Sequence, residues 1–424
     1  MSACAKRAES TDERLREEQK APTMTTADVV IVGGGIEGAA AAWALSQRGV
    51  TDVVVAERNT VASGMTGKSS GIVRCHYGVT SLAAMATVGL EVFEKADEIF
   101  GTDIGFRQTG YVVGVGEPNV ESLRKSLAAQ RAVGVQTEEI DRSEVARMWP
   151  FADLSPFEAF GWEARGGYGD AYMTAQAFAA SARAAGVRIR QGATATGLSV
   201  ERGRVTGVRL ADGSEISAGT VVVATGVWTR SFLEPYRLSY GVDVPIRVVR
   251  EQIVTIAPGI DSTAVASLPV FSDLVSLQYV RPEVGGDIVF GNSDLSDVEQ
   301  ADPDNYLNRA TDAFVDLTVD KVGTRFPGFT HAAISSSYAG CYDVTPDWNP
   351  VISTTALDGL VVAAGFSGHG FKIAPAVGRL VADLVVDGHS NDPRIPHSDF
   401  RLSRFAEDDL LKSPYPYVGA GQMR

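Results

Sequence analysis

The stretch GFSGHGFK, from Gly365 to Lys372, contains three glycines, a histidine and a lysine within eight residues. Glycine loses more conformational entropy on folding than other residues, so this density indicates a place where bare backbone approaches something closely. The lysine indicates that the approaching group carries negative charge. The residues that follow, IAPAVGRLVADLVVDG, predict a helix that ends at Gly388, and the N–H groups at its start would face the same place.

A second glycine-rich stretch lies near the start of the chain. Gly33 to Gly38 reads GGGIEG and matches G-x-G-x-x-G, with the buried-strand run VVIV before it and the helical run AAAAWALSQRG after it. In this motif the glycines allow a tight turn, close approach of a pyrophosphate, and packing of the helix on the sheet. Glu57 ends the next strand-like run, DVVVAE, and is expected to accept ribose hydroxyls. The sequence therefore predicts a βαβ dinucleotide site.

Composition limits the classes of protein that remain. The chain has 424 residues, enough for two domains, and 45% of them are hydrophobic. A formal net charge of −14 argues against nucleic acid and anionic membranes as partners. Three cysteines without paired spacing argue against a disulfide framework or a metal site and fit a reducing cytoplasm. The polar first 26 residues lack the apolar core of a signal peptide, and the longest apolar runs are too short to span a membrane.

The alternation of elements predicts an α/β fold in two domains. MTAQAFAASARAAG predicts a helix, and VVVAT and LVVAA predict buried strands of one parallel sheet. Two less regular stretches interrupt these segments. We expect a discontinuous Rossmann-like domain and a second α+β domain on a mixed or antiparallel sheet. The predicted boundaries are 1–26 for a flexible extension, 27–103, 164–235 and 336–400 for the dinucleotide domain, 104–163 and 236–335 for the substrate domain, and 401–424 for a C-terminal tail.

Three stretches in this order carry a family resemblance: ASGMTGKSSGIVR (62–74), VVVATGVWTRSFL (221–233) and AAGFSGHGFKIAPAVG (363–378). Together with the glycine motif they resemble the D-amino-acid oxidase and sarcosine oxidase superfamily, and most of all its sarcosine oxidase-like members. The resemblance covers residues 27 to 390 and implies FAD as the cofactor. It places the FAD against Gly33, Gly35, Ile36, Glu37, Gly38, Glu57, Arg58, Ser63, Lys68, Ser69, Ser70, Gly71, Ala195, Ala224, Thr225, Gly226, Trp228, Gly340, Cys341, Gly365, Gly368, His369, Gly370, Phe371 and Lys372.

The resemblance also implies roles at the reacting centre. The family oxidises a C–N bond by hydride transfer to flavin N5, and the imine product then hydrolyses. Lys372 resembles the lysine that pairs with the substrate carboxylate; the alternative is a surface lysine at the start of a helix. Arg74 and His76 lie in a segment that lines the pocket in the family, and His76 has the intrinsic pKa of a base; the alternative is a loop held by ordinary hydrogen bonds. Tyr342 is a further candidate for the pocket wall.

Three departures from the family pattern bear on mechanism. Cys341 lies one residue away from the position at which monomeric members attach FAD covalently, so we expect non-covalent FAD. Val289 stands where those members have an oxygen-activating lysine, which leaves O2 or another electron acceptor open. No second arginine follows between residues 78 and 91 to grip a carboxylate, although Arg250 and Arg281 could substitute.

The hypothesis from the sequence is an FAD-dependent oxidoreductase that acts on a small secondary or tertiary amine, such as an N-alkyl amino acid like sarcosine or dimethylglycine. One alternative is an oxidase or dehydrogenase that deaminates primary amino acids. Another is a flavoprotein assembly factor that keeps the fold without turnover. An NAD-dependent dehydrogenase is the weakest interpretation, because it gives GFSGHGFK no role.

Overall fold

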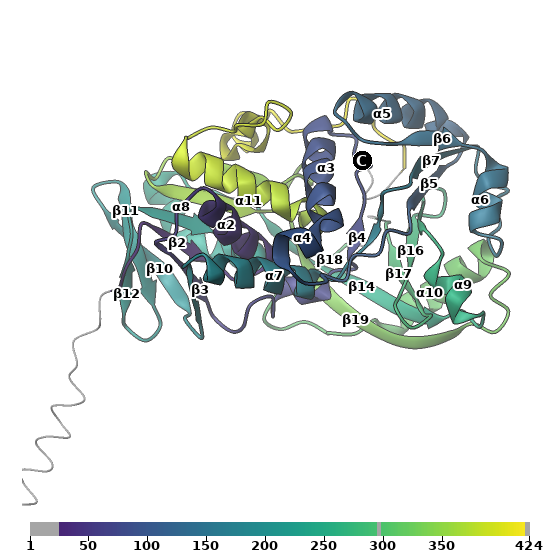
Figure 1. Ribbon diagram of the computed structural model, residues 1–424, viewed down its shortest axis with the longest axis horizontal. Helices are drawn as coiled ribbons and strands as arrows, with labels where there is room; N and C mark the ends of the chain where they lie inside the picture. Colours follow the sequence, from purple (N-terminus) through teal and green to yellow (C-terminus); the bar gives the residue numbers. More distant parts are fainter. Residues whose placement is uncertain (1–24, 295–297, 420–424) are drawn as a thin grey trace, which may run out of the picture.

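The computed structural model describes residues 25–294 and 298–419, so nearly all of the predicted N-terminal extension lies outside the described residues. The molecule is elongated, with the glycine-motif sheet toward one end and a larger sheet toward the other (Figure 1). The helices α2 (Ile36–Gln47) and α11 (Gly370–Val386), which begin after the two glycine-rich stretches, pack side by side. Their N-termini open onto the space between the two sheets.

A six-stranded sheet carries the glycine motif. Its order is β20 (Val351–Thr354), β21 (Leu360–Ala364), β13 (Thr220–Val223), β2 (Val29–Val32), β3 (Val53–Glu57) and β9 (Arg188–Gln191), and all pairs except β20–β21 are parallel. Val29 and Ile31 face a core shared with the helices, whereas Val30 and Val32 face a second core. Burial on both faces explains why VVIV lacks polar alternation.

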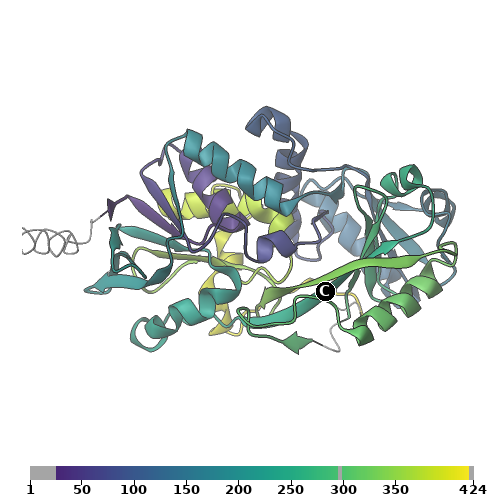
Figure 2. The same cartoon turned by 90° about the horizontal axis from the view of Figure 1, so that it is seen from below.

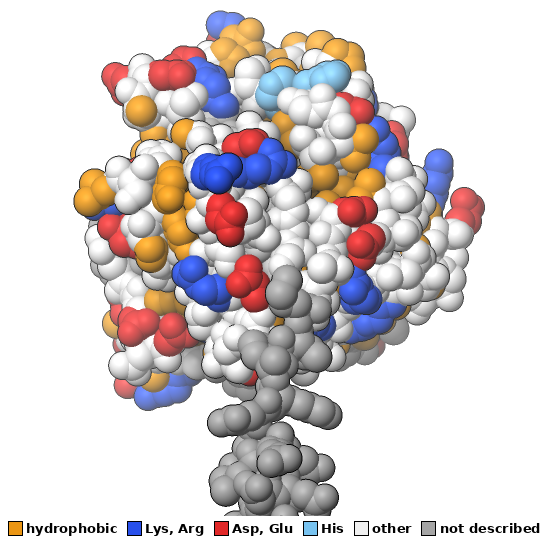
Figure 3. All heavy atoms as spheres, turned by 90° about the vertical axis from the view of Figure 1, so that its left-hand side faces the viewer, with side chains coloured by type: hydrophobic (Ala, Val, Ile, Leu, Met, Phe, Trp, Pro, Cys, Tyr) orange, Lys and Arg blue, Asp and Glu red, His pale blue; other side chains and the backbone are white. Residues whose placement is uncertain are grey.

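The two faces of this sheet are covered differently. On one face α2 and α11 pack with α3 (Thr80–Glu94) and α7 (Ala171–Ala184). The other core includes α8 (Thr229–Tyr240) and a four-stranded sheet. That sheet has the order β1 (Thr25–Thr26), β12 (Glu215–Ser217), β11 (Arg204–Leu210) and β10 (Ala195–Glu201). Acidic and basic side chains are interspersed over this end of the molecule (Figure 3), so the negative net charge is not concentrated on this face.

A mixed nine-stranded sheet forms the other half. Its order is β18 (Glu299–Gln300), β14 (Arg247–Ala257), β17 (Ile288–Asn292), β16 (Gln278–Pro282), β15 (Val270–Asp273), β5 (Tyr111–Val115), β7 (Ala159–Glu163) and β6 (Glu138–Ile140), and β19 (Ala333–Val344) also pairs with β14. The pair β15–β5 is parallel and the others are antiparallel. Val254, Phe271 and Phe290 share a core with α6 (Arg142–Met148), α9 (Ser262–Ala266) and α10 (Asp312–Arg325), and Figure 2 shows α10 along this sheet.

The remaining elements lie outside the three larger sheets and the helices already named. They are the antiparallel pair β4 (Ile72–Val73) and β8 (Gly167–Tyr168), the helices α4 (Ala96–Phe100) and α5 (Val120–Ala132), and the 3₁₀ turns η1 (Met65–Lys68), η2 (Glu117–Asn119), η3 (Gly226–Trp228), η4 (His397–Phe400) and η5 (Leu402–Phe405). Within the described ranges, none of the helices has both the length and the apolar character needed to cross a lipid bilayer.

The predicted fold class is confirmed: a Rossmann-like sheet interrupted in sequence, joined to a second domain on a mixed sheet. The domain boundaries stay a prediction. All strands of the six-stranded sheet come from the ranges predicted for the dinucleotide domain. However, β19 runs in the nine-stranded sheet as far as Val344, so residues 336–344 pair with the other half. The segment named a C-terminal tail is packed against the molecule through Tyr417, which is 7% exposed.

Candidate active site

The G-x-G-x-x-G turn joins strand, helix and neighbouring strand through bare backbone. Gly33 has φ of +105°, and a Cβ there would overlap the carbonyl oxygen of Ala224 on the adjacent segment. A Cβ at Gly38 would overlap the carbonyl oxygen of Gly33. These two glycines therefore fix the close approach of β2, β13 and α2. Gly35 is the N-cap of α2 and adopts φ of −68°. Ile36 N, the first N–H of the helix, donates to Thr66 Oγ1 at 3.0 Å, and the N–H groups of a first turn point out of the start of a helix.

Glu57 anchors this turn from the end of β3. Its Oε2 accepts a hydrogen bond from Gly34 N at 2.7 Å, and its Oε1 accepts one from Asn59 N at 2.8 Å. A carboxylate can accept about four hydrogen bonds, so both oxygens keep capacity for hydroxyl groups. Glu57 lines the cavity described next, and its role toward the ribose stays a prediction.

A cavity of about 600 Å³ lies between the two sheets. It is bounded by the starts of α2 and α11, the turn at η1, the turn at η3, and strands β14 and β19. All the predicted FAD residues line it except four, namely Gly38, Gly71, Gly365 and His369. Gly71 packs against Gly169 and Gly365 packs against Thr345. In each pair a Cβ on the first glycine would overlap an atom of the second residue. Tyr342 also lines the cavity, as predicted for the pocket wall, and so do Glu251, Ile253, Tyr306 and Asp343, which the sequence did not single out.

The GFSGHGFK stretch forms the turn from β21 into α11. Gly365 N donates to Asp343 Oδ2 at 2.7 Å, and Ser367 adopts a positive φ of 51°. A Cβ at Gly368 would lie 2.5 Å from the ring of Tyr342, so the glycine lets that ring close over the turn. Gly370, Phe371 and Lys372, at the start of α11, line the same cavity as the start of α2.

Two cations lie buried beside this turn. Lys372 is 6% exposed, and its Nζ lies 3.4 Å from Gly368 O. Arg74 is 7% exposed; it donates to His76 O, and its guanidinium lies 4.4 Å from the centre of the Tyr77 ring. Burial lowers the pKa of Lys372 well below its usual range, and the nearby charge of Arg74 lowers it further. Among residues 25–294 and 298–419, no carboxylate lies within ion-pair distance of either cation.

The structure places the two predicted histidines away from the 600 Å³ cavity. Nε2 of His76 is 2.8 Å from Tyr417 Oη, and Nδ1 is 3.3 Å from the amide nitrogen of Gln130. Both ring nitrogens are thus engaged, and burial lowers the pKa of His76 to about 3. The predicted role of His76 as a base has no support in this geometry. The ring of His369 packs edge-on against Tyr77.

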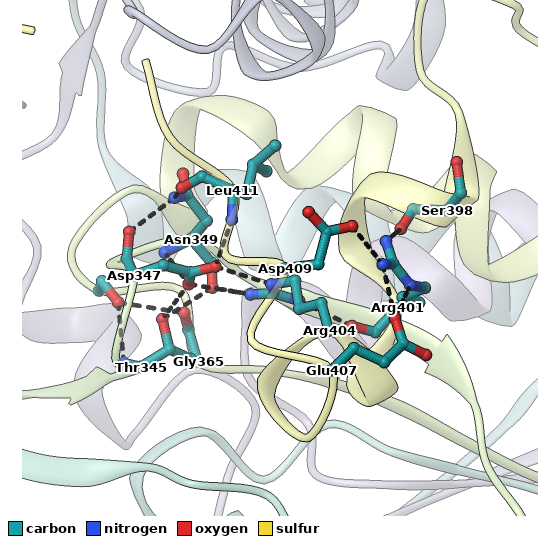
Figure 4. A network of polar contacts seen from close by, with 11 residues as sticks. Thr345, Asp347, Asn349, Gly365, Ser398, Arg401, Arg404, Glu407, Asp409 and Leu411 are labelled. Atoms are coloured by element: carbon teal, nitrogen blue, oxygen red, sulfur yellow. Dashed lines mark hydrogen bonds and ion pairs between the residues drawn. The ribbon is translucent and has the colours of Figure 1, made fainter. Parts of the chain in front are cut away.

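Arg74, His76, Tyr77 and His369 line a second cavity of about 510 Å³. Its opposite wall consists of residues 346–349 and the C-terminal segment, of which 410–413, 416, 417 and 419 contribute. Figure 4 shows how this wall is held: Arg404 forms two hydrogen bonds of 2.7 and 3.0 Å with Asp347, and Asp347 also accepts from Leu411 N at 3.0 Å. The side chains of Asp347 and Arg404 are 1% and 0% exposed. Sequence reasoning missed this wall, because an aspartate and an arginine so far apart give no local signal.

Comparisons with known proteins identify the family of this chain. The model of the family described as DAO, FAD dependent oxidoreductase, matches residues 28–384. The chain is 29% identical over 394 residues to 4-methylaminobutanoate oxidase (formaldehyde-forming) of Paenarthrobacter nicotinovorans; the match covers 91% of this chain and 46% of that relative, so the chain spans less than half of its length. It is 28% identical to sarcosine oxidase subunit beta of Rhizobium meliloti, over 91% of this chain and 89% of the relative.

A solved structure is similar over almost the whole fold. L-proline dehydrogenase from P. horikoshii matches with a TM-score of 0.82 and 27% sequence identity, over 92% of this chain and 100% of that one. L-amino acid deaminase from Proteus vulgaris, at 22% identity and a TM-score of 0.78, shares the fold. The family predicted from the three marker stretches is confirmed by the match of its model.

Proposed function

Since this chain belongs to the DAO family of FAD-dependent oxidoreductases, we propose that it oxidises the C–N bond of a secondary or tertiary amine that carries a carboxylate, such as an N-alkyl amino acid. The observation that carries the proposal is the pair of buried cations, Lys372 and Arg74, without an ion-pair partner in the described part of the chain. A buried, uncompensated charge is strongly destabilising, so an anionic ligand group is expected to complete the site. A carboxylate fits, because it accepts charge-assisted hydrogen bonds from both kinds of cation.

The residues present fit FAD. The start of α2, fixed by close packing at Gly33 and Gly38, and the start of α11 both line one cavity, which suits the pyrophosphate and an edge of the flavin that gains negative charge. Glu57 would hold the ribose, and the turn from Gly365 to Gly370 would hold the flavin edge. When bound, FAD supplies the acceptor for the hydride that leaves the substrate carbon.

Protein side chains would prepare the substrate amine for this transfer. The amine must be neutral before hydride leaves, and the positive charge of Arg74, which is near enough to lower the pKa of Lys372, also favours the neutral amine. Tyr342 does not serve as a base at neutral pH, because burial raises its pKa well above the usual value. Its ring, packed on Gly368, instead forms a wall that keeps water from the reacting carbon.

The electron acceptor after hydride transfer is part of the same proposal. Ile288 and Phe290 belong to the core under the nine-stranded sheet, so the alternation of β17 places Val289 on the opposite face. From that face Glu251 and Ile253 of β14 line the flavin cavity, whereas Val289 is not among the lining residues. An apolar valine offers no charge to stabilise reduced oxygen. We therefore propose slow reoxidation by O2 and turnover with another acceptor. The buried free thiols of Cys75 and Cys341 fit the cytoplasm as the compartment of this reaction.

An anaerobic substrate panel, followed by admission of air, tests the proposal. N-methyl amino acids should bleach the flavin absorbance of the holoenzyme, whereas their carboxamides should do so at least about 100-fold more slowly, because the carboxylate contact is lost. Formaldehyde or an alkylamine should appear as product. Release of ammonia from primary amino acids would favour the deaminating alternative, and a flavin that stays oxidised with every amine would favour the non-catalytic one.

A further inference from the structure

The carboxyl group of Glu37 is buried in the wall of the flavin cavity and lacks a hydrogen-bond partner among the residues described. Glu37 is in the first turn of α2 and is 8% exposed. Neither Oε1 nor Oε2 has a donor or acceptor within reach in those residues. A buried polar group without partners is costly, so a group of this kind that lines a cavity points to a ligand atom that completes it.

Glu37 lies where the two glycine-rich stretches meet. Gly370, the first residue of α11, is so near that a Cβ there would be 2.5 Å from Oε1 of Glu37. Because residue 370 is a glycine, the start of α11 leaves space for the carboxyl group of Glu37. The group stands between the starts of α2 and α11, both of which line the cavity proposed for the cofactor.

Asp343 is the charged residue that shifts the pKa of Glu37. Asp343 Oδ2 accepts from Gly365 N at 2.7 Å, and burial raises the pKa of Asp343 to about 6. Burial, and next the charge of Asp343, raise the pKa of Glu37 well above its usual range. Two neighbouring carboxyl groups in a buried site do not both ionise readily. Asp343, which receives backbone N–H groups, keeps the negative charge, so Glu37 carries the proton and has one O–H to donate.

We propose that Glu37 is a neutral hydrogen-bond donor to an oxygen or nitrogen acceptor of the bound FAD. An ionised carboxylate at this place would cancel the attraction that the two helix N-termini exert on phosphate and on reduced flavin. A protonated one adds a side-chain donor to the backbone donors. The inference rests on FAD binding and not on the choice of amine, so its failure would leave the proposed substrate class untouched.

Two substitutions separate a neutral donor from an ionised or a purely space-filling side chain. Glu37→Gln keeps the shape and an N–H donor, and Glu37→Met keeps the volume without a donor. In titrations of FAD into the FAD-depleted full-length protein, the Kd should stay within about threefold for Gln and rise about tenfold for Met. A Met variant that binds FAD as tightly as wild type, or a Gln variant that binds it about tenfold more tightly, overturns the proposal.

Infrared spectra of the holoenzyme test the protonation itself and require only wild type and the isosteric variant. The C=O stretch of a protonated carboxylic acid should be present in wild type and lost in Glu37→Gln. Glu163→Gln is the matched control, because Glu163 is a second buried acid with an unpartnered oxygen but lies outside the cavity lining. That control should leave the Glu37 band and the Kd for FAD unchanged. A wild-type spectrum without a band that depends on Glu37 contradicts the proposal.

Discussion

The two sheets bound the same cavity by different means. On the six-stranded side much of the lining is backbone, at turns where glycines such as Gly33 and Gly368 leave no room for a side chain. On the nine-stranded side the lining comes from side chains, such as Glu251 and Ile253, that alternate along β14 with the core residues Val254 and Ile256. Backbone contacts suit a cofactor that is the same in every member of the family. Side-chain contacts can change one at a time, which suits a substrate that differs between members.

The largest effect is expected where the backbone contacts are tightest. Gly38→Ala places a methyl group on the carbonyl oxygen of Gly33, and neither backbone segment can move without separating α2 from β2. We expect a colourless protein with a Tm lowered by several degrees, because such strain costs about 1–3 kcal/mol or more. Absorbance at the flavin band and thermal unfolding measure this.

Gly35→Ala is the matched control within the motif. The nearest atom to a Cβ at Gly35 is Thr66 Oγ1, at 3.3 Å, and the φ of −68° suits alanine. The Tm of the FAD-free protein should stay near wild type while FAD binding weakens, because the methyl group obstructs the pyrophosphate. An equal loss of Tm in Gly35→Ala and Gly38→Ala would contradict the proposal that Gly38 serves helix packing and Gly35 serves the approach of the pyrophosphate.

The next effect lies on the substrate side. Lys372→Met removes a buried cation while keeping the volume, and kcat/KM for N-alkyl amino acids should fall about 100-fold as a charge-assisted contact is lost. The flavin spectrum should persist. Lys412→Met is the control, because Lys412 is exposed and does not line the flavin cavity, and it should change kcat/KM less than about twofold. An unchanged kcat/KM in Lys372→Met would show that Lys372 does not bind the substrate carboxylate.

A smaller effect should appear in the pH dependence of carboxylate binding. The pKa of Lys372 is lowered, so its ammonium group loses the proton, and with it the attraction for an anion, at lower pH than an ordinary lysine does. The Kd of an aliphatic carboxylate without an amine should therefore rise about tenfold as the pH increases through this lowered pKa. Lys372→Arg, which stays charged, should abolish the rise. A wild-type Kd that is flat up to the usual lysine range contradicts the lowered pKa.

The smallest effect is predicted for Cys341, which lies in the cavity wall. Burial raises the pKa of its thiol to about 11, so the reactive thiolate is scarce at neutral pH. Acid precipitation should release all FAD from wild type and from Cys341→Ser alike. Flavin that stays with the wild-type pellet, but not with that of the variant, would show covalent attachment.

The contrast between the sheets also explains what the sequence could predict. The family, the fold class and FAD are confirmed, because the glycine turns and buried parallel strands leave local patterns. The sequence did not predict that Glu251 and Ile253 line the cavity, because this depends on which face of β14 is turned toward the cavity. Arg74 and His369 line a second cavity that is completed by residues from the segment 410–419, and no local pattern connects that segment to them. The substrate assignment and the roles of individual site residues stay predictions.

The order of strands in the six-stranded sheet has a consequence for how the chain acquires its site during synthesis. β13 lies between β2 and β21, so the sheet at the glycine motif lacks one flank until Leu360–Ala364 has left the ribosome. The stretch from Val223 to Leu360 takes on the order of ten seconds to translate. Throughout that interval the edge of β13 is open to pairing with other chains. The nascent protein is thus expected to need chaperone protection of this edge, and FAD to bind only after α11 has been made.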